Sequence, residues 1–152
     1  MRVFKRVELQ GAARTLPAKY YNSAEIFDAE RERVFGKAWL YVGRADEIPS
    51  AGDYFLYALF DESVIVVRGP DEKVRALYNV CRHRGTRMCE TASGKFTGAI
   101  QCPYHASTYG LDGRLMAARN MQDAPGFDKQ DWPLAQAHLA EWEGCLLYTS
   151  PS

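Results

Sequence analysis

Two short cysteine–histidine pairs constrain this chain more than any other feature of its sequence. The first pair is Cys81 and His83, and the second is Cys102 and His105. Each pair combines one thiolate with one imidazole, and eighteen residues separate His83 from Cys102. The pairs contain two of the four cysteines and two of the three histidines. This concentration of metal-binding groups makes the two segments the first place to look for a functional site.

Thiolates and imidazoles from two loops suit an iron–sulfur cluster. Two cysteines can hold one iron of a [2Fe–2S] cluster while two histidines hold the other. Neutral imidazoles remove negative charge from one iron, so such clusters have potentials of roughly −150 to +300 mV, against about −400 mV for plant-type clusters with cysteines only. Zinc is the alternative, but its common sites pair cysteine with cysteine and histidine with histidine. The mixed pairs favour the cluster and leave a structural zinc module in a binding protein as the alternative.

Composition argues against several other classes of function. The chain has 152 residues with 19 basic and 19 acidic side chains, so its net charge gives no reason to expect nucleic acid or an anionic membrane as a partner. Residues 1–16 contain no apolar run that would form a signal peptide, and Val64–Val67 is too short to span a bilayer. We therefore expect a soluble, cytoplasmic protein. The four cysteines could form two disulfides after export, but without an export signal a metal role is favoured.

The predicted elements are one helix followed by short strands. Residues 22–36 carry apolar side chains at near-helical spacing, with Asn22 or Ser23 as the N-cap, and predict an amphipathic helix that covers a sheet. Aromatic and β-branched runs then predict a small antiparallel β sandwich or barrel, in which Asp112-Gly113 forms a hairpin turn. Both Cys–His pairs fall in loops at strand ends. The predicted strands are 54–60, 63–68, 74–79, 99–102, 107–109 and 142–147, and 122–131 is a predicted surface loop.

The two motifs resemble a known signature. Asn79–Gly85 and Cys102–His105 are similar to the Rieske signature of ring-hydroxylating oxygenase α subunits, and Tyr109–Leu115 resembles the hairpin that follows it there. The resemblance covers about residues 17–147. It implies that the four paired residues are the ligands of a [2Fe–2S] cluster. It also implies an electron-transfer domain of a non-haem iron oxidoreductase, such as a dioxygenase of aromatic hydrocarbon catabolism. Similar domains serve enzymes that act on aromatic rings, quaternary amines and other small molecules, so the substrate stays open.

The resemblance further implies partners and a domain order. A reductase or a ferredoxin would supply electrons, and the full-length subunit would form a homo-oligomer, with a trimer suggested. We expect a helical lead-in at 1–38, a Rieske domain at 39–147 and a tail at 148–152 that is truncated before a catalytic domain. Arg82, Arg84 and Arg87 surround His83 and could form an electropositive rim for an acidic donor protein. The alternative is an ordinary solvated loop whose arginines have carboxylate partners nearby.

One position departs from the family. Ser107 stands where these oxygenases usually have a tryptophan, and high-potential Rieske proteins of respiratory chains have a serine there. We predict that Ser107, with Tyr109, donates hydrogen bonds at the cluster and raises its potential slightly. The alternative is a loop serine that faces solvent. The loop disulfide of the respiratory proteins would need cysteines at Thr86 and Tyr104, so it cannot form here.

The remaining cysteines and the third histidine suggest no second metal site. We expect Cys89 and Cys145 to be small buried packing residues. The mononuclear Fe(II) of such oxygenases needs two histidines and a carboxylate, and outside the pairs the chain has only His138. The mononuclear iron is therefore expected only in the missing domain, and this fragment would relay electrons without catalysing on its own. A freestanding Rieske-type ferredoxin is the alternative, although such carriers usually lack the helix before the β domain.

Overall fold

The computed structural model describes residues 14–121 and 124–149, and this part of the chain is mainly β. A seven-stranded antiparallel sheet has the order β1-β10-β9-β4-β3-β2-β5, and a three-stranded antiparallel sheet has the order β6-β7-β8. The predicted antiparallel β fold is confirmed. The strands are β1 (Leu40–Arg44), β2 (Asp53–Leu59), β3 (Glu62–Arg68), β4 (Val74–Tyr78), β5 (Ser93–Lys95), β6 (Ala99–Gln101), β7 (Thr108–Gly110), β8 (Leu115–Ala117), β9 (Gln136–Trp142) and β10 (Cys145–Thr149).

Strand β3 forms the centre of the large sheet because both of its faces are buried. Ile65 and Val67 point into one apolar cluster, whereas Val64 and Val66 point into a second cluster on the other face. All four side chains are at most 2% exposed. Burying a side chain of this size stabilises the fold by about 1.5–3 kcal/mol. The Ile65 face is the one that also carries Cys81 and Cys102, so the core itself supports the candidate site.

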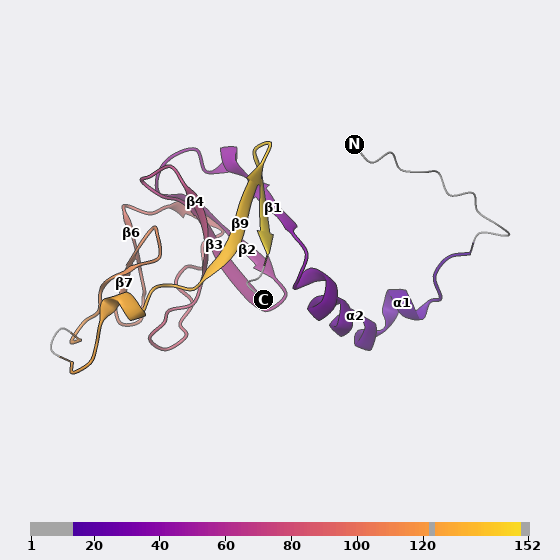
Figure 1. Ribbon diagram of the computed structural model, residues 1–152, viewed down its shortest axis with the longest axis horizontal. Helices are drawn as coiled ribbons and strands as arrows, with labels where there is room; N and C mark the ends of the chain where they lie inside the picture. Colours follow the sequence, from indigo (N-terminus) through magenta and orange to yellow (C-terminus); the bar gives the residue numbers. More distant parts are fainter. Residues whose placement is uncertain (1–13, 122–123, 150–152) are drawn as a thin grey trace.

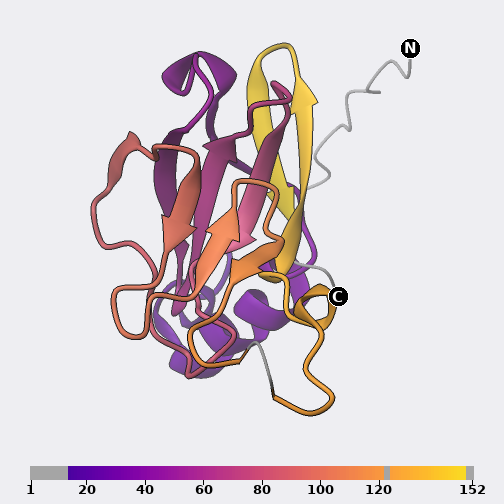
Figure 2. The same ribbon diagram turned by 90° about the vertical axis from the view of Figure 1, so that its left-hand side faces the viewer.

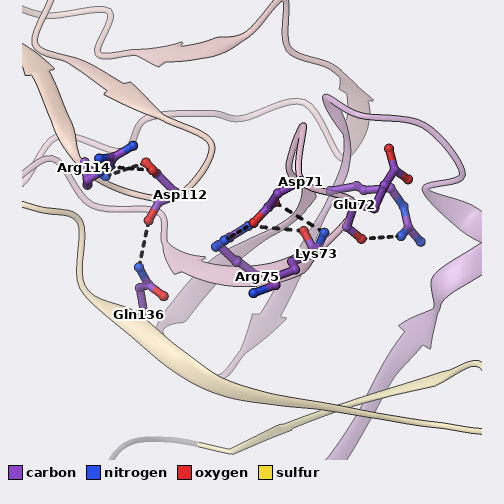
Figure 3. Close-up of polar contacts among 8 residues, drawn as sticks. Asp71, Glu72, Lys73, Arg75, Asp112, Arg114 and Gln136 are labelled. Carbon is purple, nitrogen blue, oxygen red and sulfur yellow. Dashed lines mark hydrogen bonds and ion pairs between the residues drawn. The ribbon is translucent and has the colours of Figure 1, made fainter.

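The small sheet is attached to the large one through its β7–β8 hairpin. Gly113 has a φ of +87°, and a Cβ there would lie 3.1 Å from the Leu77 side chain, so a side chain would be both strained and crowded. The Leu134 N–H donates to the Gly113 carbonyl at 2.8 Å, and the Gln136 side chain donates to the Asp112 carbonyl at 2.9 Å (Figure 3). The hairpin predicted at Asp112-Gly113 is therefore present, and it packs against β4 and β9.

The N-terminal helices differ from the prediction. Two helices, α1 (Lys19–Asn22) and α2 (Ala24–Glu30), and a π-helical turn, η1 (Arg31–Phe35), replace the single helix predicted over 22–36. Ser23 interrupts the run because its hydroxyl accepts a hydrogen bond from the Ile26 N–H at 3.4 Å and caps α2. The Asn22 alternative for this cap is wrong, since Asn22 ends α1.

The prediction that the helix covers a sheet is also wrong. They project from the end of the molecule opposite the small sheet (Figure 1), and none of their residues is buried. Their anchor is the β2–β3 turn, where Phe27 and Phe35 each meet the Phe60 ring at 5.7 Å and Arg31 pairs with Asp61 at 2.9 Å. Both faces of the central strand are already covered by other strands and loops, so no open face remains for the helix.

The C-terminal part forms a hairpin rather than the single strand predicted over 142–147. Strands β9 and β10 are joined by Glu143 and Gly144, which have φ values of +48° and +75°. Positive φ at both positions is what a tight antiparallel turn requires. Strand β10 continues two residues past position 147, and Tyr148 is buried. No helix among the described residues has the length and apolarity needed to cross a membrane.

Candidate metal centre

The two Cys–His pairs lie in two loops that close in the same way (Figure 2 shows the strands that carry them). In the first loop the Cys81 N–H donates to the Thr86 carbonyl at 2.8 Å, and the Gly85 N–H donates back to the Cys81 carbonyl at 2.9 Å. In the second loop the Cys102 N–H donates to the Ser107 carbonyl at 2.8 Å, and the Ala106 N–H donates to the Cys102 carbonyl at 3.0 Å. Each cysteine is thus fixed by its backbone on both sides.

Both loops need a left-handed residue at the same position. Gly85 and Ala106 each lie four residues after the cysteine and have φ values of +71° and +58°. Glycine adopts this conformation freely, whereas alanine pays roughly 1–2 kcal/mol for it. Ala106 therefore has a strained backbone conformation, which the surrounding hydrogen bonds of the second loop maintain.

The two histidine rings come together although they belong to different loops. The rings of His83 and His105 meet edge to face at 73°, with 4.8 Å between their centres. His83 is exposed and His105 is half-buried. Among the described residues, the Nδ1 atom of His105 is buried without a hydrogen-bond partner. A buried ring nitrogen without a partner is unfavourable in a folded protein, and a metal ion would satisfy it.

The two cysteines of the pairs lie in the buried core. Cys81 and Cys102 are each 2% exposed and belong to one buried cluster. The Tyr109 hydroxyl accepts from the Arg82 N–H at 3.3 Å, which leaves its own proton to point at the Cys81 Sγ, 3.7 Å away. Burial raises the pKa of the Cys81 thiol, but hydrogen bonds from the His83 N–H and from neighbouring side chains outweigh it and bring the pKa below its usual value. The site is arranged to keep this sulfur as a thiolate, the form that binds metals.

Ser107 is part of this arrangement. It is only 6% exposed, so the interpretation as a loop serine that faces solvent is wrong. Its hydroxyl is one of the hydrogen-bond donors that lower the pKa of the Cys81 thiol, together with Tyr109. Tyr109 lies on β7 and Ser107 directly precedes that strand, so both groups that lower this pKa come from one segment.

A zinc ion and a [2Fe–2S] cluster require different arrangements of their donors. Within residues 14–121 and 124–149, no three His, Cys, Asp or Glu side chains converge as ligands of a single metal ion would. A tetrahedral zinc ion needs four donors around one point. A [2Fe–2S] cluster instead shares its four donors between two irons, so they need not converge.

The other predicted residues lie apart from the pairs. Cys89 is half-buried rather than fully buried, and its thiol donates to the Tyr54 hydroxyl at 3.1 Å. Cys145 is also half-buried, with its Sγ 3.8 Å from an Arg44 nitrogen. His138 is exposed on β9. The cysteines at 81, 89, 102 and 145 all have free thiols.

The surface around the histidines is basic and aromatic. The Tyr104 ring stacks on His105 with 3.7 Å between ring centres, and the Arg84 guanidinium lies 5.8 Å from the centre of Tyr104. The Arg82 guanidinium lies 5.8 Å from the centre of the Trp132 ring. No ion pair in the described part of the chain includes Arg82, Arg84, Arg87 or Arg119. The alternative of arginines neutralised by nearby carboxylates therefore finds no support among these residues.

Two hollows flank the small sheet. A cavity of about 160 Å³ opens at the histidines and is lined by His83, His105, Ser107 and Tyr109 among others. A larger hollow of about 960 Å³ lies between the β3–β4 turn and the β7–β8 hairpin. Its charged groups are mostly paired with one another, as in the Asp71–Arg75 and Asp112–Arg114 pairs at 2.7 and 2.6 Å (Figure 3). The small cavity is therefore the one that is lined by the candidate histidine ligands and the two hydroxyl side chains.

Comparison with known proteins gives a consistent result. The protein-family model described as "Rieske [2Fe-2S] domain" matches residues 38–133. The oxygenase subunit of carnitine monooxygenase from Acinetobacter baumannii is 38% identical over 132 residues, which is 87% of this chain and 35% of that protein. The oxygenase subunit of glycine betaine monooxygenase from Chromohalobacter salexigens is 45% identical over 104 residues, 68% of this chain and 23% of that protein.

Solved structures show the same likeness. The apo form of CntA, a quaternary ammonium Rieske monooxygenase, superposes with a TM-score of 0.84 at 36% identity, covering 89% of this chain and 39% of that one. Naphthalene 1,2-dioxygenase from Rhodococcus sp. gives a TM-score of 0.83 at 36% identity, covering 88% of this chain and 31% of that one. The chain spans about a third of the length of the carnitine monooxygenase subunits that it matches.

Proposed function

This chain belongs to the Rieske [2Fe–2S] domain family, and from that premise we propose that Cys81, His83, Cys102 and His105 are the ligands of its cluster. The chain corresponds to the Rieske region of oxygenase α subunits, and its homologues are monooxygenases and dioxygenases. The Nδ1 of His105, which has no hydrogen-bond partner among the described residues and whose ring meets that of His83, is the observation that carries the ligand assignment.

The surrounding residues prepare the site for one-electron transfer. A bound cluster supplies a one-electron acceptor at the surface of the fold. Cys81 and Cys102 are buried and each is fixed by backbone hydrogen bonds, while the more exposed histidines face the outside. Tyr109 and Ser107 donate hydrogen bonds toward the Cys81 sulfur, which favours the state with more negative charge. A fixed sulfur environment with an accessible imidazole side is suited to receiving an electron from another protein.

The donor that this surface suits is an acidic protein. We propose a reductase or a ferredoxin as the donor, because the histidines are surrounded by exposed aromatic rings and by arginines that form no ion pair within residues 14–121 and 124–149. The electron would pass to a mononuclear iron in a part of the enzyme outside this chain. One solved relative is described in terms of inter-subunit electron transfer, which supports a homo-oligomer of the full-length subunit here as well.

The wider assignments follow from the relatives. Carnitine and glycine betaine monooxygenase subunits match at 38–45% identity, whereas biphenyl 2,3-dioxygenase subunit alpha matches at 34%. We therefore propose that the complete enzyme oxidises a quaternary ammonium compound, one of the substrate classes that the sequence left open beside aromatic hydrocarbons. We also propose that residues 39–147 form the Rieske domain after a helical lead-in, and that the enzyme works in the cytoplasm, a reducing compartment that keeps Cys81 and Cys102 available to the cluster and Cys89 and Cys145 as thiols.

Metal analysis and spectroscopy of the purified protein test the central proposal. We expect about two irons and two acid-labile sulfides per chain, visible absorption, and an EPR signal that appears on reduction. A colourless, EPR-silent protein with one zinc per chain would overturn the proposal, because zinc has neither signal. For the substrate, the complete enzyme should demethylate or hydroxylate carnitine or glycine betaine faster than biphenyl, and the opposite preference would restore the aromatic expectation.

A further inference from the structure

The side chain of Asn79 is fully buried, and its amide uses all four of its hydrogen-bonding positions. Its Oδ1 accepts from the backbone N–H groups of Met88 at 3.0 Å and Cys89 at 2.9 Å. Its Nδ2 donates to the Cys89 carbonyl at 2.6 Å and to the Ser63 hydroxyl at 3.3 Å. Three of these four bonds reach the two residues that follow the first ligand loop.

These bonds close that loop at its base. The loop begins two residues after Asn79, and a bridge between Val80 and Arg87 forms the rung above it. At the rung of Asn79, the backbone bond from the Met88 N–H to the Asn79 carbonyl is 3.4 Å long, so the shorter side-chain bonds hold the two strands of the loop together. The Asn79 N–H donates to the Ser63 carbonyl at 2.9 Å, which ties the clamp to β3.

The clamp also controls what lies beneath the sulfurs. Met88, whose N–H is held by Asn79, is 6% exposed and belongs to the same buried cluster as Cys81 and Cys102. A shift of Met88 would therefore change the packing under both cysteines. The amide clamp and the ligand pairs form one unit, although Asn79 itself does not touch a ligand atom.

We propose that Asn79 is a positioning residue that sets the first ligand loop against the second and so fixes the geometry of the cluster. The inference rests on the proposed ligand set. A purely structural role would lower the stability of the whole domain without changing the environment of the iron atoms. A positioning role changes the electronic spectrum of the reduced cluster and the rate at which iron is lost, since residues that orient ligands affect metal affinity by roughly 10–100-fold.

Four variants of the full chain separate these roles. Asn79→Ala removes all four bonds, and Asn79→Asp keeps the two acceptor bonds but loses both donors. Ser63→Ala removes only the bond that does not reach the ligand loop. Val66→Ala is the matched control, because Val66 is fully buried in the apolar cluster on the other face of the sheet and should lower the unfolding midpoint alone.

The readouts are the g values and linewidths of the reduced EPR signal and the rate of iron loss to a chelator. Both Asn79 variants should broaden or shift the signal and lose iron roughly tenfold faster, while Ser63→Ala and Val66→Ala keep the wild-type spectrum. If the Asn79 variants keep that spectrum and chelation rate and lose only stability, as Val66→Ala does, the inference is wrong. A wild-type protein without iron and sulfide would overturn the ligand set and this inference together.

A second measurement does not depend on the folding of any variant. In the loaded wild-type protein the amides of Met88 and Cys89 should exchange with deuterium as slowly as those of β3, because the Asn79 oxygen holds both. Exchange as fast as that of an exposed loop would show that the clamp does not hold in solution, and would overturn the inference.

Discussion

The imidazole rings of His83 and His105 meet edge to face with their centres 4.8 Å apart. Each ring is held in place by its own loop, because the cysteine of that loop is fixed by backbone hydrogen bonds. Two independently closed loops thus deliver their imidazoles to one place. A chance contact between surface histidines would not require such support, and the arrangement is what a shared metal cluster needs.

The first prediction concerns the ligands. Cys102→Ala should reduce iron content from about two per chain to near zero, since one iron loses a thiolate that nothing nearby replaces. Cys89→Ala is the matched control, because Cys89 is a half-buried thiol near the same core that contacts Tyr54. It should retain iron at the wild-type level. Iron retained by Cys102→Ala, or lost by Cys89→Ala, would contradict the ligand set; both are read by iron and sulfide analysis.

The second prediction concerns Ser107. Ser107→Ala should lower the midpoint potential by about 50 mV, because a hydrogen bond of about 1.2 kcal/mol to the reduced cluster corresponds to that shift for one electron. Tyr109→Phe should act in the same direction. Ser63→Ala removes a hydroxyl bonded to Asn79 and should leave the potential unchanged. Redox titration followed by EPR measures the potential of all three variants. An unchanged or higher potential in Ser107→Ala would show that the Ser107 hydroxyl does not stabilise the reduced cluster.

The third prediction concerns the basic rim, Arg82 and Arg84. If it steers an acidic donor, reduction by an acidic [2Fe–2S] ferredoxin should slow on the order of tenfold between 20 and 500 mM salt. The double variant Arg82→Gln, Arg84→Gln should be slow at low salt and nearly insensitive to salt. Arg114→Gln changes the same charge on an exposed arginine that is paired with Asp112, and should behave as wild type. Stopped-flow rates without salt dependence in the wild-type protein would exclude steering.

The sequence located the candidate ligands, which stay a proposal, more directly than it located the helices. The ligand types and their spacing are local, so Cys81, His83, Cys102 and His105 could be chosen from the chemistry of their side chains alone, and the structure brings their loops together. The hairpin at Asp112-Gly113 was predictable for the same reason, since turn residues act locally.

Features that depend on distant parts of the chain were not predictable. Strand β5 consists of Ser93, Gly94 and Lys95, which carry no strand signal and pair with β2 only because that edge is available. The amphipathic pattern of 22–36 indicates a helix but not its partner, which is the Phe60 ring of a turn. The clamp made by Asn79 was missed as well, since nothing in the sequence indicates that its amide reaches Met88 and Cys89.

The fourth prediction concerns alkaline stability. Burial, together with the Cys89 thiol, raises the pKa of Tyr54 to about 12. The unfolded chain loses this proton near pH 10, so the stabilisation is complete below pH 10 and is lost as the pH rises to about 12. The free energy of unfolding should fall by ~2 kcal/mol over this window. In urea titrations Tyr54→Phe should show a smaller fall than wild type, and an equal fall would contradict the assignment to Tyr54.

The fifth prediction uses the matched loops. Gly85 and Ala106 occupy the same left-handed position, so exchanging their residue types should have opposite effects. Gly85→Ala meets no atom within 4 Å but forces a side chain into left-handed backbone, and should destabilise the protein by about 1 kcal/mol. Ala106→Gly relieves that strain and should stabilise it by about 0.5 kcal/mol, because the added entropy of the unfolded chain offsets part of the gain. Urea unfolding of the metal-free protein measures both, and a stabilising Gly85→Ala or a destabilising Ala106→Gly would show that the two loops are not equivalent.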